Sequence, residues 1–227
     1  MSRSSTLLKI YYLLLKEYGE QHWWPAETPF EVMLGAILTQ NTAWTNVEKA
    51  ITGLKKACDL TPEGILSLAP EQLEEAIQSS GYFRQKAERV HGFCLYLVKT
   101  GEGDISRMED IPTSKLREEL LALKGIGPET ADSILLYALS RSVFVVDAYT
   151  RRLLSRLGMC PETAKYEDLQ AQFMDNLDPD AEMFNEYHAL IVRHAKERCR
   201  KREPECEECA LRKLCKFYLR SEISNLR

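Results

Sequence analysis

Long apolar runs, a secretion signal and low-complexity segments are all missing from this 227-residue chain. Its longest uncharged apolar runs resemble SILLYALS (residues 133–140) and fall far short of the roughly 20 residues that span a bilayer. The N-terminal apolar stretch is interrupted by Lys9 and Lys16, and no small-residue cleavage site follows it. We therefore expect a soluble, cytoplasmic protein that does not enter a membrane.

A net excess of basic residues is also missing, since the formal net charge is −4. The charge is uneven, however, because residues 193–220 contain ten Lys or Arg against five Glu. Such a local basic face can bind phosphate while the rest of the chain stays acidic, although a solvated tail would have the same composition. The remaining composition, 44% hydrophobic and 28% charged, is typical of one large or two small globular domains.

Strand-like segments are nearly absent, and the one candidate, residues 142–146, is too short and solitary to form a sheet. Apolar residues recur at helical spacing instead, and Thr28 with Pro29 and Glu31 has the pattern of a capped helix start. The sequence therefore predicts an all-α protein with short connections. The expected helical stretches are residues 6–18, 28–40, 73–77, 87–98, 116–123, 134–139, 150–157 and 182–195.

The segment GIGPETA (residues 125–131) lacks the third glycine and the preceding strand of a dinucleotide-binding fingerprint. It also lacks the Lys-Ser/Thr pair of a phosphate-binding P-loop. An amphipathic helical pattern precedes it, so the arrangement reads helix, glycine turn, helix. Gly125 and Gly127 allow backbone N–H groups to face a nucleic-acid phosphate, whereas a plain αα-hairpin is the alternative.

This spacing resembles the helix-hairpin-helix motif of DNA repair glycosylases, the superfamily that contains endonuclease III. Asp147 follows an apolar run eighteen positions after Glu129 and opens a basic amphipathic helix. Taken alone, an aspartate there is a helix cap. The resemblance implies instead that Asp147 is the catalytic carboxylate.

Four cysteines crowd the C-terminal region with the spacing Cys199-x6-Cys206-x2-Cys209-x5-Cys215. Four thiolates so close together indicate a metal centre, for which either zinc or a [4Fe–4S] cluster needs such a set, whereas a coincidental spacing with an empty site is the alternative. The spacing resembles the iron–sulfur loop (199–215) of endonuclease III and the adenine-mismatch glycosylases. The resemblance implies a structural [4Fe–4S] cluster that fixes three basic residues against DNA phosphates: Arg200, Lys201 and Arg202.

The resemblance covers most of the chain from about Thr28 onward and implies two helical modules. Residues 25–140 would form a six-helix module with the hairpin, and residues 1–24 plus 141–227 would form a discontinuous module with the cluster loop. Double-stranded DNA with a damaged base would lie between them, bound by a monomer. The flipped nucleotide leaves a gap in the duplex, which Gln40 or Asn41 would fill.

Glu129 stands where strand-cutting members of the superfamily have a lysine. A glutamate cannot form the Schiff base that cuts the strand, so the sequence predicts a monofunctional glycosylase that uses water. A first-turn acid that complements the helix dipole is the alternative interpretation of this residue.

The combination WWP, LTQNT and GIG-x-E-[ST]-AD resembles the type III 3-methyladenine DNA glycosylases, although this chain keeps the cluster cysteines and has Pro128 where a described member has lysine. Electron-rich rings attract a cationic alkylated base by about 0.5–2 kcal/mol per contact. The expected base pocket comprises Trp23, Trp24, Pro25, Trp44 and Glu129. Two alternatives stay open: a glycosylase for oxidised pyrimidines or mismatched bases, and a cluster-bearing protein that binds damage without catalysis.

Overall fold

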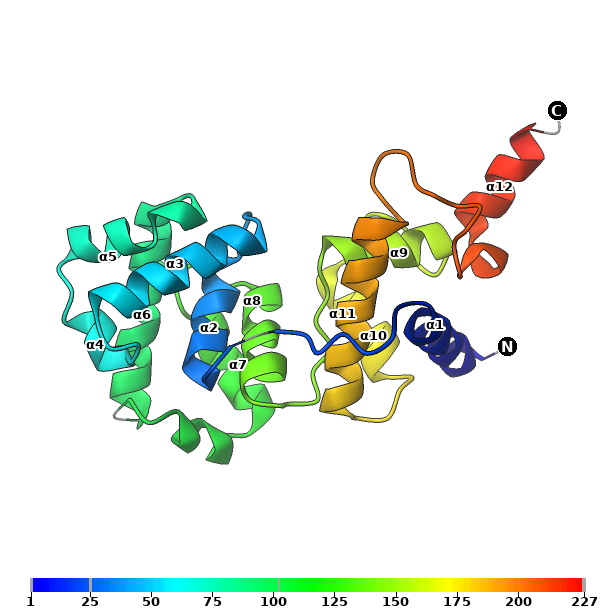
Figure 1. Cartoon of the computed structure of the whole chain (residues 1–227). Coiled ribbons are helices and arrows are strands. Elements are labelled where there is room, and N and C mark those ends of the chain that lie inside the picture. The colour runs from blue at the N-terminus through cyan, green and yellow to red at the C-terminus, as the bar shows by residue number, and fades with distance from the viewer. Residues whose placement is uncertain (1, 25, 102, 226–227) are drawn as a thin grey trace. The chain divides into compact units, whose positions relative to one another are not determined.

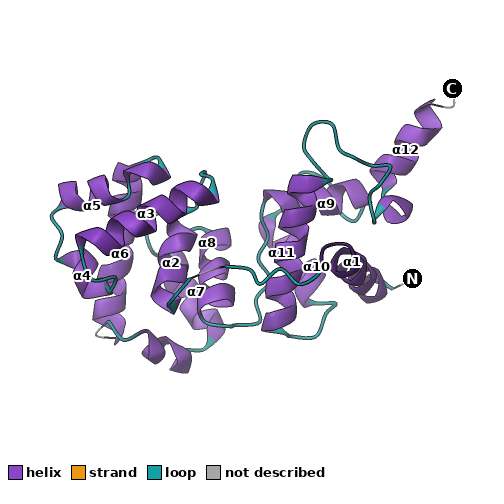
Figure 2. Ribbon diagram, in the orientation of Figure 1, coloured by secondary structure: helices purple, strands orange, loops and turns teal. Residues whose placement is uncertain are grey.

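The structure, a computed structural model, describes residues 2–24, 26–101 and 103–225, with side chains to residue 220. Within these ranges the chain is helical and contains no strand (Figure 2), which confirms the all-α prediction. None of the described helices combines the length and the apolar character needed to cross a membrane. Residues 142–146 form an extended connection in which Val143, Phe144, Val145 and Val146 are buried.

The chain folds into two compact units, residues 1–23 with 142–227 (unit 1) and residues 24–141 (unit 2). Unit 2 contains α2 (Pro29–Leu38), α3 (Trp44–Ala57), α4 (Pro62–Leu66), α5 (Pro70–Ala76), α6 (Phe83–Gly101), α7 (Thr113–Leu121) and α8 (Pro128–Ser133) (Figure 1). Unit 1 contains α1 (Arg3–Tyr18), α9 (Ala148–Leu157), α10 (Tyr166–Met174), α11 (Ala181–Glu197) and α12 (Lys216–Asn225).

The core of unit 2 is built around α2, in which every residue from Phe30 to Leu38 except Glu31 is buried. The Thr28 hydroxyl accepts a hydrogen bond from the backbone N–H of Glu31, so the expected helix start is confirmed. The Glu31 carboxylate does not complete a capping box on Thr28. It lies 3.0 Å from Lys55 Nζ of α3 instead, and this ion pair ties α2 to its neighbour.

A π-helical segment over Ile134–Ala138 directly continues α8, so the helix expected to start at Pro128 runs on through the apolar residues from Ile134 with a change of helix type. Its first three residues are buried, and the segment packs against α2. The glycine turn is thereby carried by a helix whose far end is fixed in the core of unit 2.

The core of unit 1 centres on α11, which packs against α1 and α9. Phe144 lies parallel to Phe173 of α10, with ring centroids 3.7 Å apart, and edge-on to Tyr187 of α11 at 5.8 Å. These rings hold the extended connection 142–146 in place immediately before α9. The N-terminus of α9 is therefore positioned by a packed aromatic cluster.

Candidate functional site

The glycine turn joins α7 to α8 in unit 2. Gly125 has a φ of +81°, which glycine adopts without strain, whereas Gly127 caps α8 with a φ of −96°. Both glycines are exposed, and Ile126 between them is 5% exposed. One buried side chain thus anchors the turn; the Arg89 side chain lies against Gly125, whereas a Cβ on Gly127 would meet nothing within 4 Å.

Gln40 and Asn41 lie in the turn after α2 and are held differently. The Gln40 amide Nε2 donates to Gly125 O at 3.1 Å and to Thr130 Oγ1 at 2.9 Å. Its Oε1 accepts a hydrogen bond from Arg89 of α6. Asn41 is exposed and has a left-handed φ of +55°. Gln40 therefore couples this turn to the glycine hairpin, and Asn41 is presented to solvent.

A buried lysine that the sequence did not single out supports the same turn. Lys86 of α6 is 1% exposed, and its Nζ donates to Leu38 O at 2.8 Å and to Ser80 O at 2.6 Å. Burial lowers the pKa of Lys86 to about 8, with a smaller contribution from the charge of Arg89. The sequence signal was a lysine on the apolar stripe of α6, between Phe83 and Val90.

Trp24, Trp44 and Tyr137 form an aromatic cluster in unit 2. The Trp24 ring stacks on Tyr137 at 4.7 Å and meets Trp44 edge-on at 5.0 Å. Gly35 of α2 makes room for the two indoles, because a Cβ there would lie 3.3 Å from Trp24 and 3.4 Å from Trp44. The structure therefore brings together two of the expected pocket residues and adds Tyr137.

An open cavity of about 280 Å³ lies beside this cluster. The Trp24 Nε1 atom is buried and has no hydrogen-bond partner among the described residues. A buried indole N–H is normally paired, so this unpaired donor is unusual for a packed tryptophan. Both indoles, two acids and a lysine contribute to the cavity wall: Trp24, Trp44, Glu31, Glu48 and Lys55.

The other expected pocket residues are distributed differently. Trp23 belongs to unit 1, where Lys196 Nζ lies 5.9 Å from its ring centroid. Pro25 lies outside the described residues. Glu129 is exposed on the first turn of α8.

Lys124, which precedes the turn, is also exposed, and its Nζ donates to Glu88 of α6 at 2.7 Å.

Asp147 is the N-cap of α9 in unit 1, so it opens a helix as the sequence predicted. Its Oδ1 accepts hydrogen bonds from the backbone N–H and the hydroxyl of Thr150, at 2.7 and 2.9 Å. Its Oδ2 lies 3.6 Å from Nε2 of His188 on α11. Burial favours a higher pKa for Asp147, but His188 and the Thr150 hydrogen bonds outweigh it and hold the pKa below the ordinary value. The structure thus presents a largely buried, ionised carboxylate.

The four C-terminal cysteines line one cavity between α9, α11 and the loop that leads to α12. Cys199 Sγ accepts a hydrogen bond from Arg156 Nη1 at 3.2 Å, and Cys215 Sγ lies 3.4 Å from Arg156 O. Among the described residues, no three His, Cys, Asp or Glu side chains approach closely enough to bind one metal ion. A four-iron cluster takes one thiolate at each iron, and the shared cavity with its four thiols fits that donor set.

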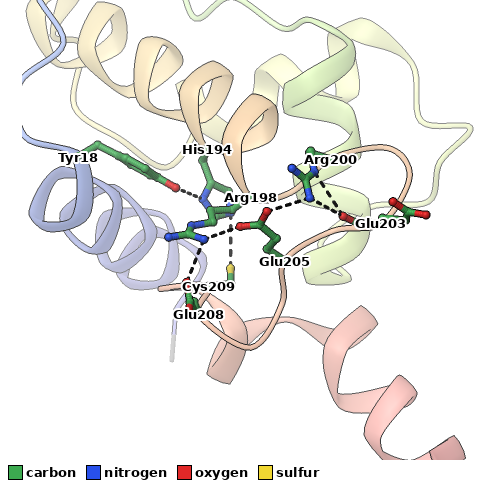
Figure 3. A network of polar contacts seen from close by, with 8 residues as sticks. All are labelled: Tyr18, His194, Arg198, Arg200, Glu203, Glu205, Glu208 and Cys209. Atoms are coloured by element: carbon green, nitrogen blue, oxygen red, sulfur yellow. Dashed lines mark hydrogen bonds and ion pairs between the residues drawn. The ribbon is translucent and has the colours of Figure 1, made fainter.

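Ion pairs and a histidine support the cysteine loop (Figure 3). His194 Nε2 lies 3.6 Å from Cys209 Sγ, and its Nδ1 lies 2.9 Å from the Tyr18 hydroxyl of α1. Arg198 bonds Glu205 and Glu208 within the loop. Arg200 is held 2.9 Å from Glu205, whereas Lys201 and Arg202 are exposed. Lys201 and Arg202, two of the three expected phosphate-binding residues, are therefore exposed and form no ion pair with an acidic side chain among the described residues.

Comparisons with known proteins agree with this architecture. Residues 34–179 match the HhH-GPD superfamily of base excision DNA repair proteins. The Methanocaldococcus jannaschii protein MJ1434, whose name assigns it only provisionally to the DNA repair glycosylases, is 48% identical over 92% of this chain and 95% of its own. Endonuclease III of Thermotoga maritima is 32% identical over 91% of both chains.

A solved structure shows the same fold. The Helicobacter pylori 3-methyladenine DNA glycosylase bound to 1,N6-ethenoadenine has a TM-score of 0.71 and 30% identity, covering 87% of this chain and 98% of its own. The resemblance inferred from the hairpin spacing is confirmed, because the family match includes the glycine turn and Asp147. The chain belongs to the HhH-GPD superfamily of base excision DNA repair proteins and is a DNA glycosylase of the endonuclease III group.

Proposed function

We propose that this glycosylase removes alkylated purines, of the 3-methyladenine kind, from double-stranded DNA without cutting the strand. The observation that carries the substrate class is the stack of Trp24 on Tyr137, closed at its edge by Trp44. A cationic purine gains about 0.5–2 kcal/mol from contact with an electron-rich aromatic face. The likeness to a 3-methyladenine glycosylase at 30% identity supports the same class.

Asp147 is the catalytic carboxylate of the proposed reaction. Cleavage of the bond between the base and C1′ develops positive charge on the sugar, which a fixed carboxylate stabilises while it orients the attacking water. The two Thr150 hydrogen bonds hold Oδ1 and leave Oδ2 as the reactive oxygen. The water adds to C1′ and passes its proton to the Asp147 carboxylate and then to solvent, while the bond to the base breaks and the cationic alkylated purine leaves as a neutral base with the bonding electrons. An alkylated purine is already a good leaving group, so no strong acid is needed.

The absence of strand cutting follows from Glu129. Its carboxylate stands on the first turn of α8, where an amine would be required to attack C1′. The neighbouring amine of Lys124 is paired with Glu88 at 2.7 Å. Borohydride reduction should therefore trap no covalent protein–DNA adduct, and the appearance of one would refute this part of the proposal.

The cofactor proposed is a [4Fe–4S] cluster held by the four cysteines, with a structural role. Their thiols line one cavity, and Arg156 and His194 already approach two of the sulfurs. The cluster would order the loop that carries Arg200, Lys201 and Arg202 against DNA phosphates, which makes binding steeply salt-dependent. We further propose that the protein acts as a cytoplasmic monomer, with the hairpin glycines binding a phosphate and Gln40 or Asn41 filling the gap in the duplex.

A base-release panel tests the substrate. Duplexes with 3-methyladenine, thymine glycol, uracil or a G·T mismatch are incubated with wild type, Trp24→Leu and Tyr12→Leu. Tyr12 is 62% exposed on α1 and serves as the matched aromatic control. Wild type and the control should release 3-methyladenine, whereas Trp24→Leu should lose roughly tenfold in release, since it removes the indole from the aromatic cluster.

Endonuclease III chemistry on oxidised pyrimidines is the second candidate, supported by the 32% identical Thermotoga maritima relative. Release of thymine glycol alone would establish it and refute the alkyl-purine proposal. Binding of every lesion with release of none would instead identify a protein that recognises damage without catalysis.

A further inference from the structure

His188 is a buried histidine that lies beside the proposed catalytic carboxylate. Its side chain is 7% exposed and that of Asp147 12%, and Nε2 lies 3.6 Å from Oδ2. The two residues come from different helices, α11 and the start of α9, and lie 41 positions apart in sequence. Only the tertiary structure brings them together.

The two carboxylate oxygens of Asp147 have different partners. Oδ1 receives both Thr150 hydrogen bonds, whereas Oδ2 faces the His188 imidazole. Burial of a carboxylate without donors would favour its neutral form, which could not stabilise a cationic sugar. The pKa of Asp147 is held down despite burial, and the charge of His188 is the largest cause that opposes burial.

The His188 ring cannot swing away freely. It packs edge-on against Phe144, at a centroid distance of 6.4 Å and an angle of 82°, and the same phenyl ring contacts Tyr187 and Phe173. Nε2 is the nitrogen that faces Oδ2, so a proton on that nitrogen points to Asp147 in the neutral ring as well as in the charged one.

Three other ionisable side chains near this site have hydrogen bonds to backbone atoms: Tyr166, Arg151 and Arg152. The Tyr166 hydroxyl of α10 accepts from Val146 N at 3.3 Å. Of the arginines of α9, Arg151 bonds Ala164 O, and Arg152 bonds Ala195 O at 3.0 Å. On α11, the imidazole of His188 lies 3.6 Å from the Asp147 carboxylate.

We propose that His188 is a positioning residue of base release, which keeps Asp147 ionised and fixes the orientation of Oδ2. The inference rests on the proposed catalytic role of Asp147. A purely structural histidine would contribute packing, and its loss would affect all pH values alike. A histidine that supports the ionised carboxylate has its greatest effect at acidic pH, where Asp147 would otherwise take up a proton.

Single-turnover base release is measured from about pH 5 to about pH 9 for wild type, His188→Phe and His188→Gln. His188→Phe keeps an aromatic ring against Phe144 but has no donor, whereas the amide of His188→Gln can donate to Oδ2. We expect His188→Phe to move the acid limb of the rate profile to higher pH, with substrate affinity within about twofold of wild type. For each pH unit by which the acid limb shifts, the rate at pH values on that limb falls about tenfold. His188→Gln should recover part of the loss.

The matched control is His91→Phe, since His91 is exposed on α6 and lies in unit 2. Circular dichroism and melting temperature establish that each variant is folded. A uniform loss in His188→Phe at all pH values, or a profile identical to wild type, would overturn the proposal. If His188→Phe does not fold, a wild-type profile in His188→Gln supports the donor role, and a uniform loss there refutes it.

The Asp147→Asn variant tests the catalytic role of Asp147 separately from the positioning role of His188. Full base release by this variant would refute the catalytic role of Asp147 and the proposed function with it. An inactive Asp147→Asn together with an unshifted His188→Phe would refute the role of His188 alone.

Discussion

Replacement of Gly125 by alanine should destabilise unit 2, whereas the same change at Gly127 should not. At Gly125 the φ of +81° disfavours any residue with a Cβ by about 1–2 kcal/mol. The added Cβ would also lie 2.7 Å from Arg89 Cδ and 2.8 Å from Arg89 Cγ, so the arginine side chain must move. At Gly127 the φ is negative and a Cβ meets nothing within 4 Å.

Movement of Arg89 has a second cost, because its guanidinium donates to Gln40 Oε1. Loss of one charge-assisted hydrogen bond costs about 1.5 kcal/mol or more. With the backbone strain, Gly125→Ala should lower the free energy of unfolding by about 2.5–3.5 kcal/mol. For a chain of this length that corresponds to a fall in melting temperature of about 5–14 °C.

Urea unfolding followed by circular dichroism, at matched protein concentration, measures the difference between Gly125→Ala and Gly127→Ala. The Gly125→Ala variant should also bind DNA more weakly, because Gln40 would lose its hydrogen bonds with Gly125 O and with Arg89, which hold its turn in place. Equal midpoints for the two variants would refute the reasoning, since it would mean that neither the left-handed backbone nor the Arg89 contact constrains the hairpin.

Three further outcomes are expected. Asp147→Asn should reduce base release by roughly 10²–10⁴-fold, with the far-ultraviolet spectrum unchanged because asparagine also caps helices; a fully active variant would contradict the catalytic assignment. The pKa of Lys86 lies at about 8 in the folded chain and near 10.5 when unfolded, so wild type should gain stability from pH 8 to about 10.5. Lys86→Met should lack that gain in thermal melts over the same range, and a parallel rise in both proteins would contradict it. Cys209→Ser should lose the visible absorbance near roughly 400 nm that a thiolate-ligated cluster gives, whereas Cys58→Ser in unit 2 should keep it; a colourless wild type with stoichiometric zinc would refute the cluster.

Features governed by neighbouring residues could be predicted from the sequence. Thr28 before Pro29 and Asp147 before Ala148 each mark a helix start, because the cap bonds an N–H only three positions ahead. The helices α3 and α10 were not anticipated, since the residues before them, Ala43 and Lys165, provide no side-chain cap. Only the helical spacing of their apolar residues indicates these two helices, and that spacing becomes visible only over the full length of each helix.

Contacts between distant segments could not be predicted in this way. Lys86 and His188 both occupy positions on apolar helix faces, where a polar residue usually indicates a buried partner. Which partner it meets depends on how helices pack, and no local pattern places His188 beside Asp147. The Trp24–Tyr137 stack joins residues 113 positions apart and likewise emerges only from the fold.

Helix α9 sets a fixed spacing between its two ends. Asp147 caps its N-terminus, and Arg156 near its C-terminus bonds Cys199 Sγ and the carbonyls of Arg200 and Lys201. An α-helix advances about 1.5 Å and turns about 100° per residue. Inserting or deleting one residue inside α9 would rotate the carboxylate by that angle relative to the cysteine loop, so this helix has to keep its length while surface loops can vary.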